Sequence, residues 1–115
     1  MTEMLTNATQ ARALSARLEF ATEWRDIDLA VITVTGDVDA ANSHRLLDYT
    51  LSKVLLCRRM ILDLSQVGFF ASDGYRILKV LESRCVLADI EFHLVLGANV
   101  GRTLQICRQA DQHEL

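Results

Sequence analysis

The sequence predicts an α/β domain with a central four-stranded mixed β-sheet and helices packed on it, in the order β-β-α-β-α-β-α. Short β-branched and apolar runs, each too brief for a helix, recur along its 115 residues. Patterns with apolar residues three and four positions apart separate the later runs, as expected of amphipathic helices. The turns between them use Gly, Asp and Asn, and the chain has no proline. Strands that alternate with helices favour a sheet covered by helices.

The first part of the chain predicts a pair of strands. Residues 1–13 show no sustained period and are expected to form a flexible arm, which leaves residues 14–115 as a single domain. Residues 17–24 alternate between apolar and polar side chains, as in a half-exposed edge strand. Residues 25–28 form a turn, and residues 29–35 are largely apolar on both faces, as in a more central strand. We expect the two strands to pair as a hairpin.

A helical crossover follows the second strand. Residues 36–39 are expected to end that strand, and Asn42 or Ser43 can cap a helix that runs to about residue 56. The expected inward face of this helix is Leu46 or Leu47, Thr50 or Leu51, and Val54. The next strand, residues 59–64, should lie parallel to its predecessor, because βαβ connections are almost always right-handed crossovers.

The remainder predicts a loop, two helices and one more strand. Residues 65–70 are expected to cross a loop, and Ser72 stands where the N-cap of a helix to about residue 87 is expected. The apolar face of that helix is Tyr75, Leu78, Leu81 and Cys85. Residues 90–96 alternate as a strand with one wetter face, and residues 97–99 form a turn and cap. A final amphipathic helix carries Val100, Leu104 and Cys107 and fades into a polar tail.

Composition limits the classes of function. A 50% share of hydrophobic and 23% of charged residues is ordinary for one compact domain. The net charge of −3 and the scattered Lys and Arg residues provide no basic surface for nucleic acid. Apolar runs are well short of the roughly 18 residues of a membrane span, and a signal peptide is not apparent. We expect a soluble cytoplasmic protein without nucleic-acid or membrane binding, and a homodimer is left open.

The stretch from Met60 to Leu78 is the most specific in the chain, since it joins a buried strand to a helix through a polar turn. It resembles the signature of STAS domains, the family of bacterial anti-sigma-factor antagonists and of the cytoplasmic tails of sulfate transporters. The matching residues are Asp63, Leu64, Ser65, Val67, Phe69, Ser72 and Gly74, and the turn Gly36-Asp37-Val38-Asp39 resembles the family's G-E-L-D turn. The similarity extends from about residue 29 to residue 110 and implies a STAS-like fold.

Ser72 has a structural and a functional interpretation. As an N-cap it would stabilise the helix by about 1 kcal/mol. As a phosphoacceptor it would gain about −1.5 to −2 charge where a helix N-terminus favours negative charge. The resemblance implies that Ser72 is phosphorylated by an anti-sigma-factor kinase and that the partner-binding residues are Asp37, Asp39, Asp73, Gly74 and Tyr75. The family's acidic residue before the serine is Ala71 here, and Asp73 either replaces its contact or mimics the modification.

Residues for catalysis or metal binding do not converge. His44, His93 and His113 have no metal-ligand spacing with one another or with the cysteines. The chain lacks a phosphate-binding G-x-x-x-x-G-K-[ST] loop, a G-x-G-x-x-G motif and a G-x-S-x-G elbow around Ser72. We therefore predict no enzyme, no cofactor and no metal. Asp63 interrupts an apolar strand, and we expect it to cap the amides of Ser65 or Gln66.

Cys57, Cys85 and Cys107 do not form a zinc or disulfide pattern, because they are odd in number and lack C-x-x-C spacing. Each falls in or at the end of a helical pattern. The favoured interpretation is a packed, reduced thiol, and redox sensing is the alternative.

Two functions of different classes remain. The first is an anti-sigma-factor antagonist that binds an anti-sigma factor or serine kinase through residues 36–39 and the Ser72 turn, which frees the sigma factor. The second is a STAS accessory module of a transporter, for small ligands or lipids, or a nucleotide-binding regulatory domain.

Overall fold

The computed structural model describes residues 17–112, and the expected arm at residues 1–13 and His113 lie outside that part of the chain. Its elements are β1 (Leu18–Trp24), β2 (Leu29–Val38), α2 (Ser43–Val54), β3 (Arg59–Phe70), α3 (Ser72–Leu87), β4 (Glu91–Leu96) and α4 (Ala98–Gln112). The strands form one sheet in the order β1-β2-β3-β4. The predicted element order and the four-stranded mixed sheet are confirmed.

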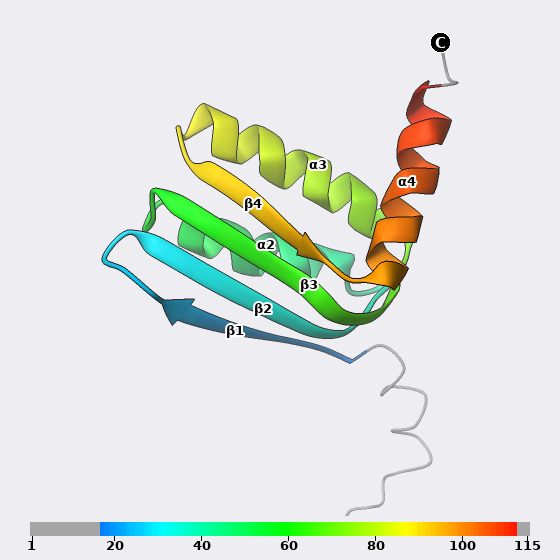
Figure 1. Ribbon diagram of the computed structural model, residues 1–115, viewed down its shortest axis with the longest axis horizontal. Helices are drawn as coiled ribbons and strands as arrows, with labels where there is room; N and C mark the ends of the chain where they lie inside the picture. Colours follow the sequence, from blue (N-terminus) through cyan, green and yellow to red (C-terminus); the bar gives the residue numbers. More distant parts are fainter. Residues whose placement is uncertain (1–16, 113–115) are drawn as a thin grey trace, which may run out of the picture.

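The sheet has one antiparallel and two parallel pairings. β1 runs antiparallel to β2, which confirms the hairpin, and β2, β3 and β4 are mutually parallel. Helices α2 and α3 cover one face of the sheet, and α4 stands at the end where β3 leads into α3 (Figure 1). Between residues 17 and 112, no helix is long and apolar enough to cross a membrane.

The core lies between the sheet and helices α2 and α3. Alternate residues of the central strands point into it and are fully buried: Ala30, Ile32, Val34, Met60, Leu62 and Leu64. The expected inward faces of the helices are buried as well, at Leu46, Thr50 and Val54 of α2 and at Leu78, Leu81 and Cys85 of α3. Since each large apolar side chain contributes about 1.5–3 kcal/mol on burial, this packing holds the helices on the sheet.

Strands β2 and β3 are longer than the sequence predicted. Residues 36–38 remain in β2, and residues 65–70, expected as a loop, continue β3 to Phe70. The pairing between the two strands shifts register between Thr33 and Thr35 and again between Gly36 and Asp37. Each irregularity inserts a residue into β3 and changes the spacing of its buried positions from two residues to three. The loop prediction was wrong because it relied on an unbroken period of two.

The helix starts also differ in detail. Asn42 is the N-cap of α2, but its side chain makes no capping hydrogen bond. The N-cap of α3 is Ala71 rather than Ser72, because the Ala71 N–H still donates to Val38 O at 2.9 Å and continues the β-ladder. Ser72 is therefore the first helical residue and does not cap the helix. Helix α4 begins at Ala98, so Asn99 lies inside its first turn.

Candidate functional site

The extended strands bring the two predicted binding segments together. We define the Ser72 corner as residues 37–39, at the end of β2, and residues 69–75, where β3 passes into α3. Asp37 pairs with Phe69 and Val38 with Phe70 in the parallel ladder. Gly68 packs so closely that a Cβ on it would lie 3.1 Å from Asp37 Oδ1. Two segments that are distant in sequence thus form one continuous surface.

Hydrogen bonds fix the acidic turn of this corner. Asp39 Oδ1 accepts from the backbone N–H groups of Ala41 and Asn42, both at 2.9 Å. The Asn42 side chain, 5% exposed, points back into the turn. Its Oδ1 accepts from Asp39 N at 2.8 Å and its Nδ2 donates to Asp37 O at 2.9 Å. Asp37 and Asp39 are therefore held in fixed positions beside the start of α3.

Ser72 lies exposed at the first position of α3. Its hydroxyl is consequently not occupied in capping the helix, and the backbone N–H groups of the first turn lie beside it. Asp73 provides an acidic side chain in the same turn and is half-buried. A helix N-terminus stabilises negative charge by about 0.3–1 kcal/mol. The start of α3 therefore presents an exposed hydroxyl at a helix end that favours negative charge.

Gly74 has a packing role that explains the glycine in this motif. It is buried, and a Cβ built on it would lie 2.5 Å from the Phe70 ring. Phe70 is itself 2% exposed and belongs to the core. The ring can occupy this position only because residue 74 has no side chain, so Gly74 allows the first turn of α3 to pack directly on Phe70.

Tyr75 ties the corner to the end of α4. Its hydroxyl donates to Asp111 Oδ2 at 2.5 Å, and Lys79 Nζ lies 3.6 Å from the same oxygen. The hydrogen bond to Asp111 raises the pKa of Tyr75 and lowers the pKa of Asp111. The charges of Tyr75 and Asp111 raise the pKa of Lys79. One edge of the corner is thus formed jointly by α3 and α4.

Comparison with protein families identifies the fold. The family model described as the STAS domain matches residues 21–112. The chain belongs to the STAS domain family. The match includes both segments of the Ser72 corner and confirms the resemblance found in the sequence.

Relatives of this STAS domain include a mycobacterial protein. This chain is 31% identical over 84 residues to "Osmosensory protein A" of Mycobacterium tuberculosis. The aligned region covers 73% of this chain and 52% of the relative. The chain thus spans about half the length of that curated relative.

Solved structures share the STAS fold. An anti-sigma factor antagonist from Mycobacterium paratuberculosis has a TM-score of 0.72 and 22% identity, covering 86% of this chain and 85% of that one. The anti-sigma factor antagonist SpoIIAA in its unphosphorylated form has a TM-score of 0.64 and 15% identity, over 81% and 84% of the two chains. SLC26A9 has a TM-score of 0.67 and 18% identity, over 96% of this chain and 23% of that one.

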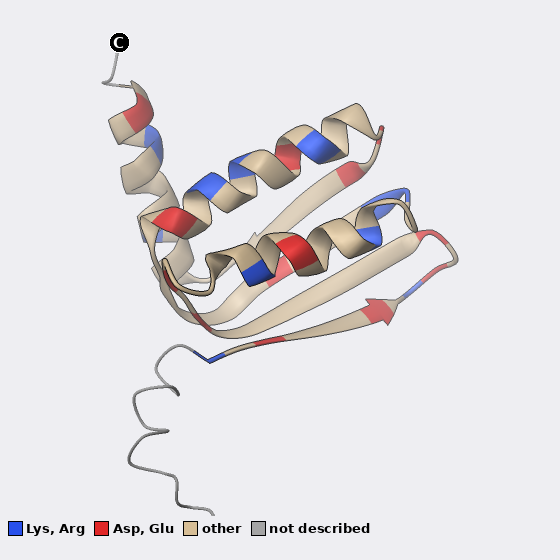
Figure 2. Cartoon of the chain, turned by 180° about the vertical axis from the view of Figure 1, so that it is seen from behind, with Lys and Arg blue, Asp and Glu red and all other residues tan. Residues whose placement is uncertain are grey.

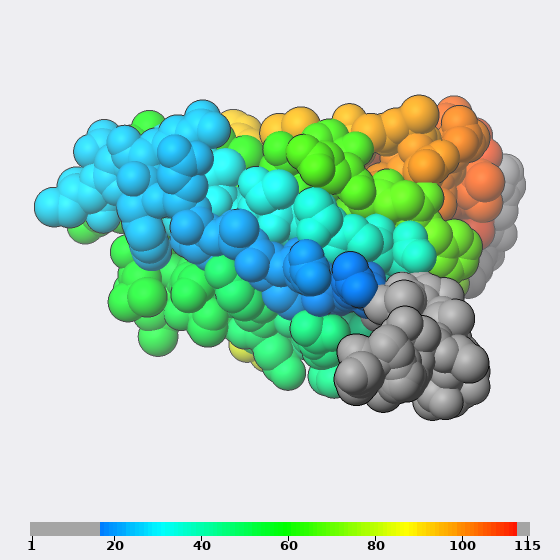
Figure 3. Space-filling view, turned by 90° about the horizontal axis from the view of Figure 1, so that it is seen from below, coloured from blue at the N-terminus to red at the C-terminus, as the bar shows by residue number. Residues whose placement is uncertain are grey.

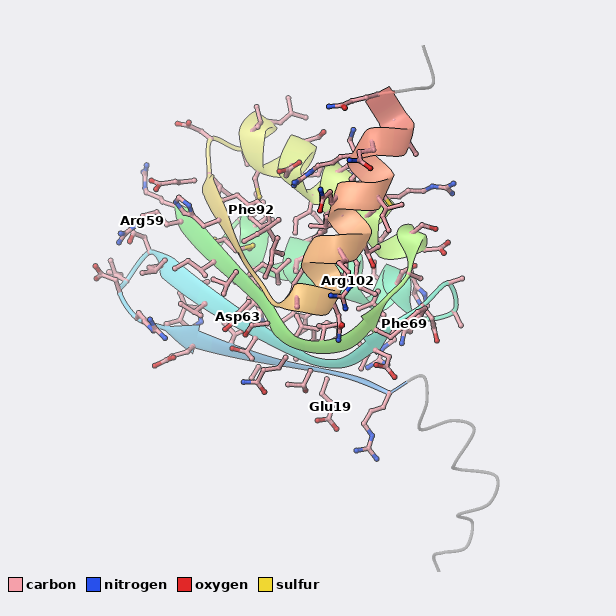
Figure 4. The ribbon with its side chains drawn as sticks, turned by 45° about the vertical axis from the view of Figure 1, so that its right-hand side comes forward. Glu19, Arg59, Asp63, Phe69, Phe92 and Arg102 are labelled. Atoms are coloured by element: carbon pink, nitrogen blue, oxygen red, sulfur yellow. The ribbon has the colours of Figure 1, made fainter. Side chains whose placement is uncertain are left out.

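Sequence reasoning assigned no contact role to Phe69, which is 56% exposed in the STAS domain. Phe69 and Phe70 are consecutive, and successive strand side chains point to opposite faces, so one of the two must leave the core. That signal was present in the sequence. Figure 4 shows Phe69 at the end of β3 toward Arg102 of α4, far from Phe92 and Arg59. An exposed aromatic ring is a common anchor for protein partners.

Arg76 is a second residue that the sequence interpretation passed over. It is exposed on α3 one turn after Ser72. Residues four apart on a helix are neighbours, so Arg76 places a positive charge on the same side of α3 as Ser72.

Other candidates lie away from the corner. Cys57 and Cys85 are buried at 8% and 1% exposure, and Cys107 is half-buried on α4. Burial, and secondarily the charge of Asp28, raises the pKa of Cys57, and burial raises the pKa of the Cys85 thiol to about 11. Burial and a raised pKa both lower the reactivity that is expected of a thiol.

The remaining polar predictions are placed as follows. His44 is exposed at the start of α2, and His93 lies on the exposed side of β4 with Nε2 2.6 Å from Glu91 Oε2. Asp63 Oδ1 accepts from the N–H and the hydroxyl of Ser65 at 2.9 and 2.6 Å, which confirms the predicted cap. Among residues 17–112, no three His, Cys, Asp or Glu side chains are grouped to hold a metal ion.

Proposed function

We propose that this chain is an anti-sigma-factor antagonist that binds an anti-sigma factor through the Ser72 corner and thereby frees the sigma factor. Phosphorylation of Ser72 ends the binding. The observation that carries the proposal is the exposed Ser72 hydroxyl at the start of α3, beside the ordered turn of Asp37 and Asp39. Similarity in fold to solved anti-sigma factor antagonists supports it.

The switch follows from charge at the contact. A phosphate on Ser72 adds about −1.5 to −2 charge to a corner that already carries Asp37, Asp39 and Asp73. The helix N-terminus and Arg76 stabilise this charge within the domain. A partner that packs on Phe69 would have to desolvate the phosphate, so binding weakens while the fold remains. SpoIIAA, a relative in fold, has been solved in unphosphorylated and phosphorylated forms.

The test is calorimetry of the purified chain against the anti-sigma factors of its own genome, with release of sigma factor as a second readout. Ser72→Ala should retain the wild-type affinity. Ser72→Glu should lower it about tenfold or more with unchanged thermal stability. Ser52→Glu is the matched control, because Ser52 is an exposed helical serine on α2 and receives the same charge. Equal affinity of all three variants would refute the corner as the interface.

Phosphorylation is tested separately. Incubation with ATP and an anti-sigma factor of the kinase type should add one phosphate, located on Ser72 by mass spectrometry and absent from Ser72→Ala. A phosphate on another serine would refute the switch but not the binding.

A second function is a STAS module of a transporter or a nucleotide-binding regulatory domain. The similarity to SLC26A9 over 96% of this chain favours retaining it. Thermal stabilisation by a nucleotide, without a complex with any anti-sigma factor, would favour this alternative.

A further inference from the structure

The end of the domain opposite the Ser72 corner exposes an unusual amount of apolar surface. We define the apolar end by the side chains Ile27, Leu55, Leu56, Val86 and Leu87. Four of them, Ile27 at 92%, Leu55 at 89%, Leu87 at 83% and Val86 at 77%, are the most exposed large hydrophobic residues between positions 17 and 112. Monomeric proteins rarely leave such groups clustered in water, and a cluster of this kind marks a contact surface.

Hydrogen bonds between loops make this end one surface. Asp28 O, in the β1–β2 turn, accepts from the N–H groups of Arg58, in the α2–β3 connection, and Arg59, the first residue of β3. Arg58 O accepts from Glu91 N at 2.9 Å, at the start of β4 after the end of α3. Figure 3 shows the β1–β2 turn projecting beside the α2–β3 connection. Ile27 and the leucines at the ends of α2 and α3 therefore belong to segments held together rather than to independent loops.

The surface of the apolar end contains three adjoining hollows. Their volumes are about 400, 640 and 320 Å³. Leu87 separates the second from the third, and Leu55 and Ala88 border both the first and the third. The second and third hollows have mainly apolar walls, and the Leu ridges beside them can interdigitate with a surface of the same kind.

The charges around the hollows are balanced. Their walls contain three acidic residues, Asp28, Glu82 and Asp89, and three basic residues, Arg58, Lys79 and Arg84. Figure 2 shows basic and acidic residues interspersed at this end of the domain. Four of the six, Arg58, Glu82, Arg84 and Asp89, make no ion pair with another described residue. A surface that binds an anionic membrane or an acidic partner carries an excess of basic residues. The walls of these hollows have no such excess.

We propose that the apolar end is the interface of a homodimer, in which a second copy of this chain is the occupant. A two-fold contact apposes a surface with itself, so it requires both apolar ridges with hollows and both signs of charge on the same patch. This surface supplies each of them. In the dimer the apolar side chains form the centre, and Arg58 and Arg84 face acidic residues of the other copy at the rim. The two Ser72 corners then point away from each other and remain free.

The test is sedimentation equilibrium of the full chain from about 1 to about 200 μM, where weak dimers dissociate. The wild type should be a dimer at the upper concentrations. Leu87→Glu should raise its dissociation constant about 100-fold or more, because each interface receives two buried charges. Ile106→Glu, the control, replaces an apolar residue that is 65% exposed on α4 and should leave the constant unchanged. A monomer throughout, or equal constants for the two variants, would overturn the proposal.

Crosslinking provides a second readout that does not depend on affinity. In a Cys107→Ser background, where the remaining cysteines are buried, Leu87→Cys or Leu55→Cys should form a dimer under mild oxidation that a reductant reverses. Ile106→Cys in the same background should remain largely uncrosslinked. Crosslinking of Ile106→Cys alone would place any dimer contact on α4 and refute the apolar end. None of these outcomes depends on whether an anti-sigma factor binds.

Discussion

The two ends of this domain are built in opposite ways. At the Ser72 corner, side chains and backbone amides satisfy one another, as Asn42 does with Asp37 and Asp39, and Phe69 is the only large apolar side chain among residues 69–75 that is more than half exposed. At the apolar end, Leu55 and Leu87 are almost fully exposed where helices stop. The first end is ordered and polar, as suits a contact that must form and break. The second is suited to a contact that excludes water.

This difference implies that one domain can hold two contacts without competition. Charge added to Ser72 acts on the polar corner, where desolvation of a phosphate is costly. Helix α3 runs between the two ends. A phosphate on Ser72 would therefore lie at its first turn, while its last turn contributes to the apolar end. A substitution at one end should therefore leave the contact at the other end unchanged.

The largest expected effect is on partner affinity. Phe69→Ala should lower the affinity for the anti-sigma factor about 30-fold or more, because exposed aromatic anchors contribute about 2 kcal/mol or more to an interface. Stability should change little, since the ring is more than half exposed. Calorimetry measures the affinity. Leu87→Glu is the counterpart at the apolar end. It should leave the affinity for the anti-sigma factor within about twofold of the wild-type value, because the substitution is distant from the corner. A comparable loss for Leu87→Glu would show that the ends are not independent.

The next effect concerns the junction of β3 and α3. Gly74→Ala should lower the free energy of unfolding by about 1–3 kcal/mol, because its Cβ would overlap the buried Phe70 ring. Gly101→Ala, on α4, meets no atom within 4 Å and should raise it by up to about 1 kcal/mol, since alanine favours a helix. Urea denaturation measures both. Destabilisation by both substitutions to the same extent would contradict the packing role of Gly74.

The order of the elements could be predicted from the sequence because buried side chains recur at two spacings. The strand and helix faces around Ile32, Leu62, Leu46 and Leu81 follow these periods and are confirmed. The length of β3 could not be predicted, since its bulges place Val67 and Phe70 three residues apart and break the period. A bulge depends on the neighbouring strand rather than on the local sequence.

The site was predictable in part. The signature placed Ser72 at the start of a helix and drew attention to Asp37 and Asp39, and the structure brings these segments together. The exact cap could not be foreseen, because it depends on the Ala71 hydrogen bond to Val38 on a different strand. The contact of Tyr75 with Asp111 depends on how α4 packs beside α3. Sequence alone records neither distance.

A smaller effect tests the ordered turn of the corner. Asn42→Ala should lower the free energy of unfolding by about 1–2 kcal/mol, because it removes a buried side chain that bonds to Asp39 N and Asp37 O. Asn99→Ala removes an exposed bond to Gly68 O and should cost about 0.5 kcal/mol. Thermal unfolding followed by circular dichroism measures both, with Asn42→Asp as a variant that retains the acceptor. An equal cost for the two alanine substitutions would remove the distinction between buried and exposed bonds.

The smallest effect is on the thiols, two of which lie beneath the apolar end. In native protein at pH 8, a thiol reagent should label Cys107 and leave Cys57 and Cys85 unmodified, and all three should react after unfolding. Because burial raises the pKa of Cys85 in the folded state to about 11 from 9.0, the unfolded chain loses this proton first. The contribution of the Cys85 thiol to the free energy of unfolding is therefore fully present below pH 9 and is lost as the pH rises toward 11. Rapid native labelling of Cys85 at neutral pH would instead show that the apolar end opens, which a stable dimer contact there would prevent.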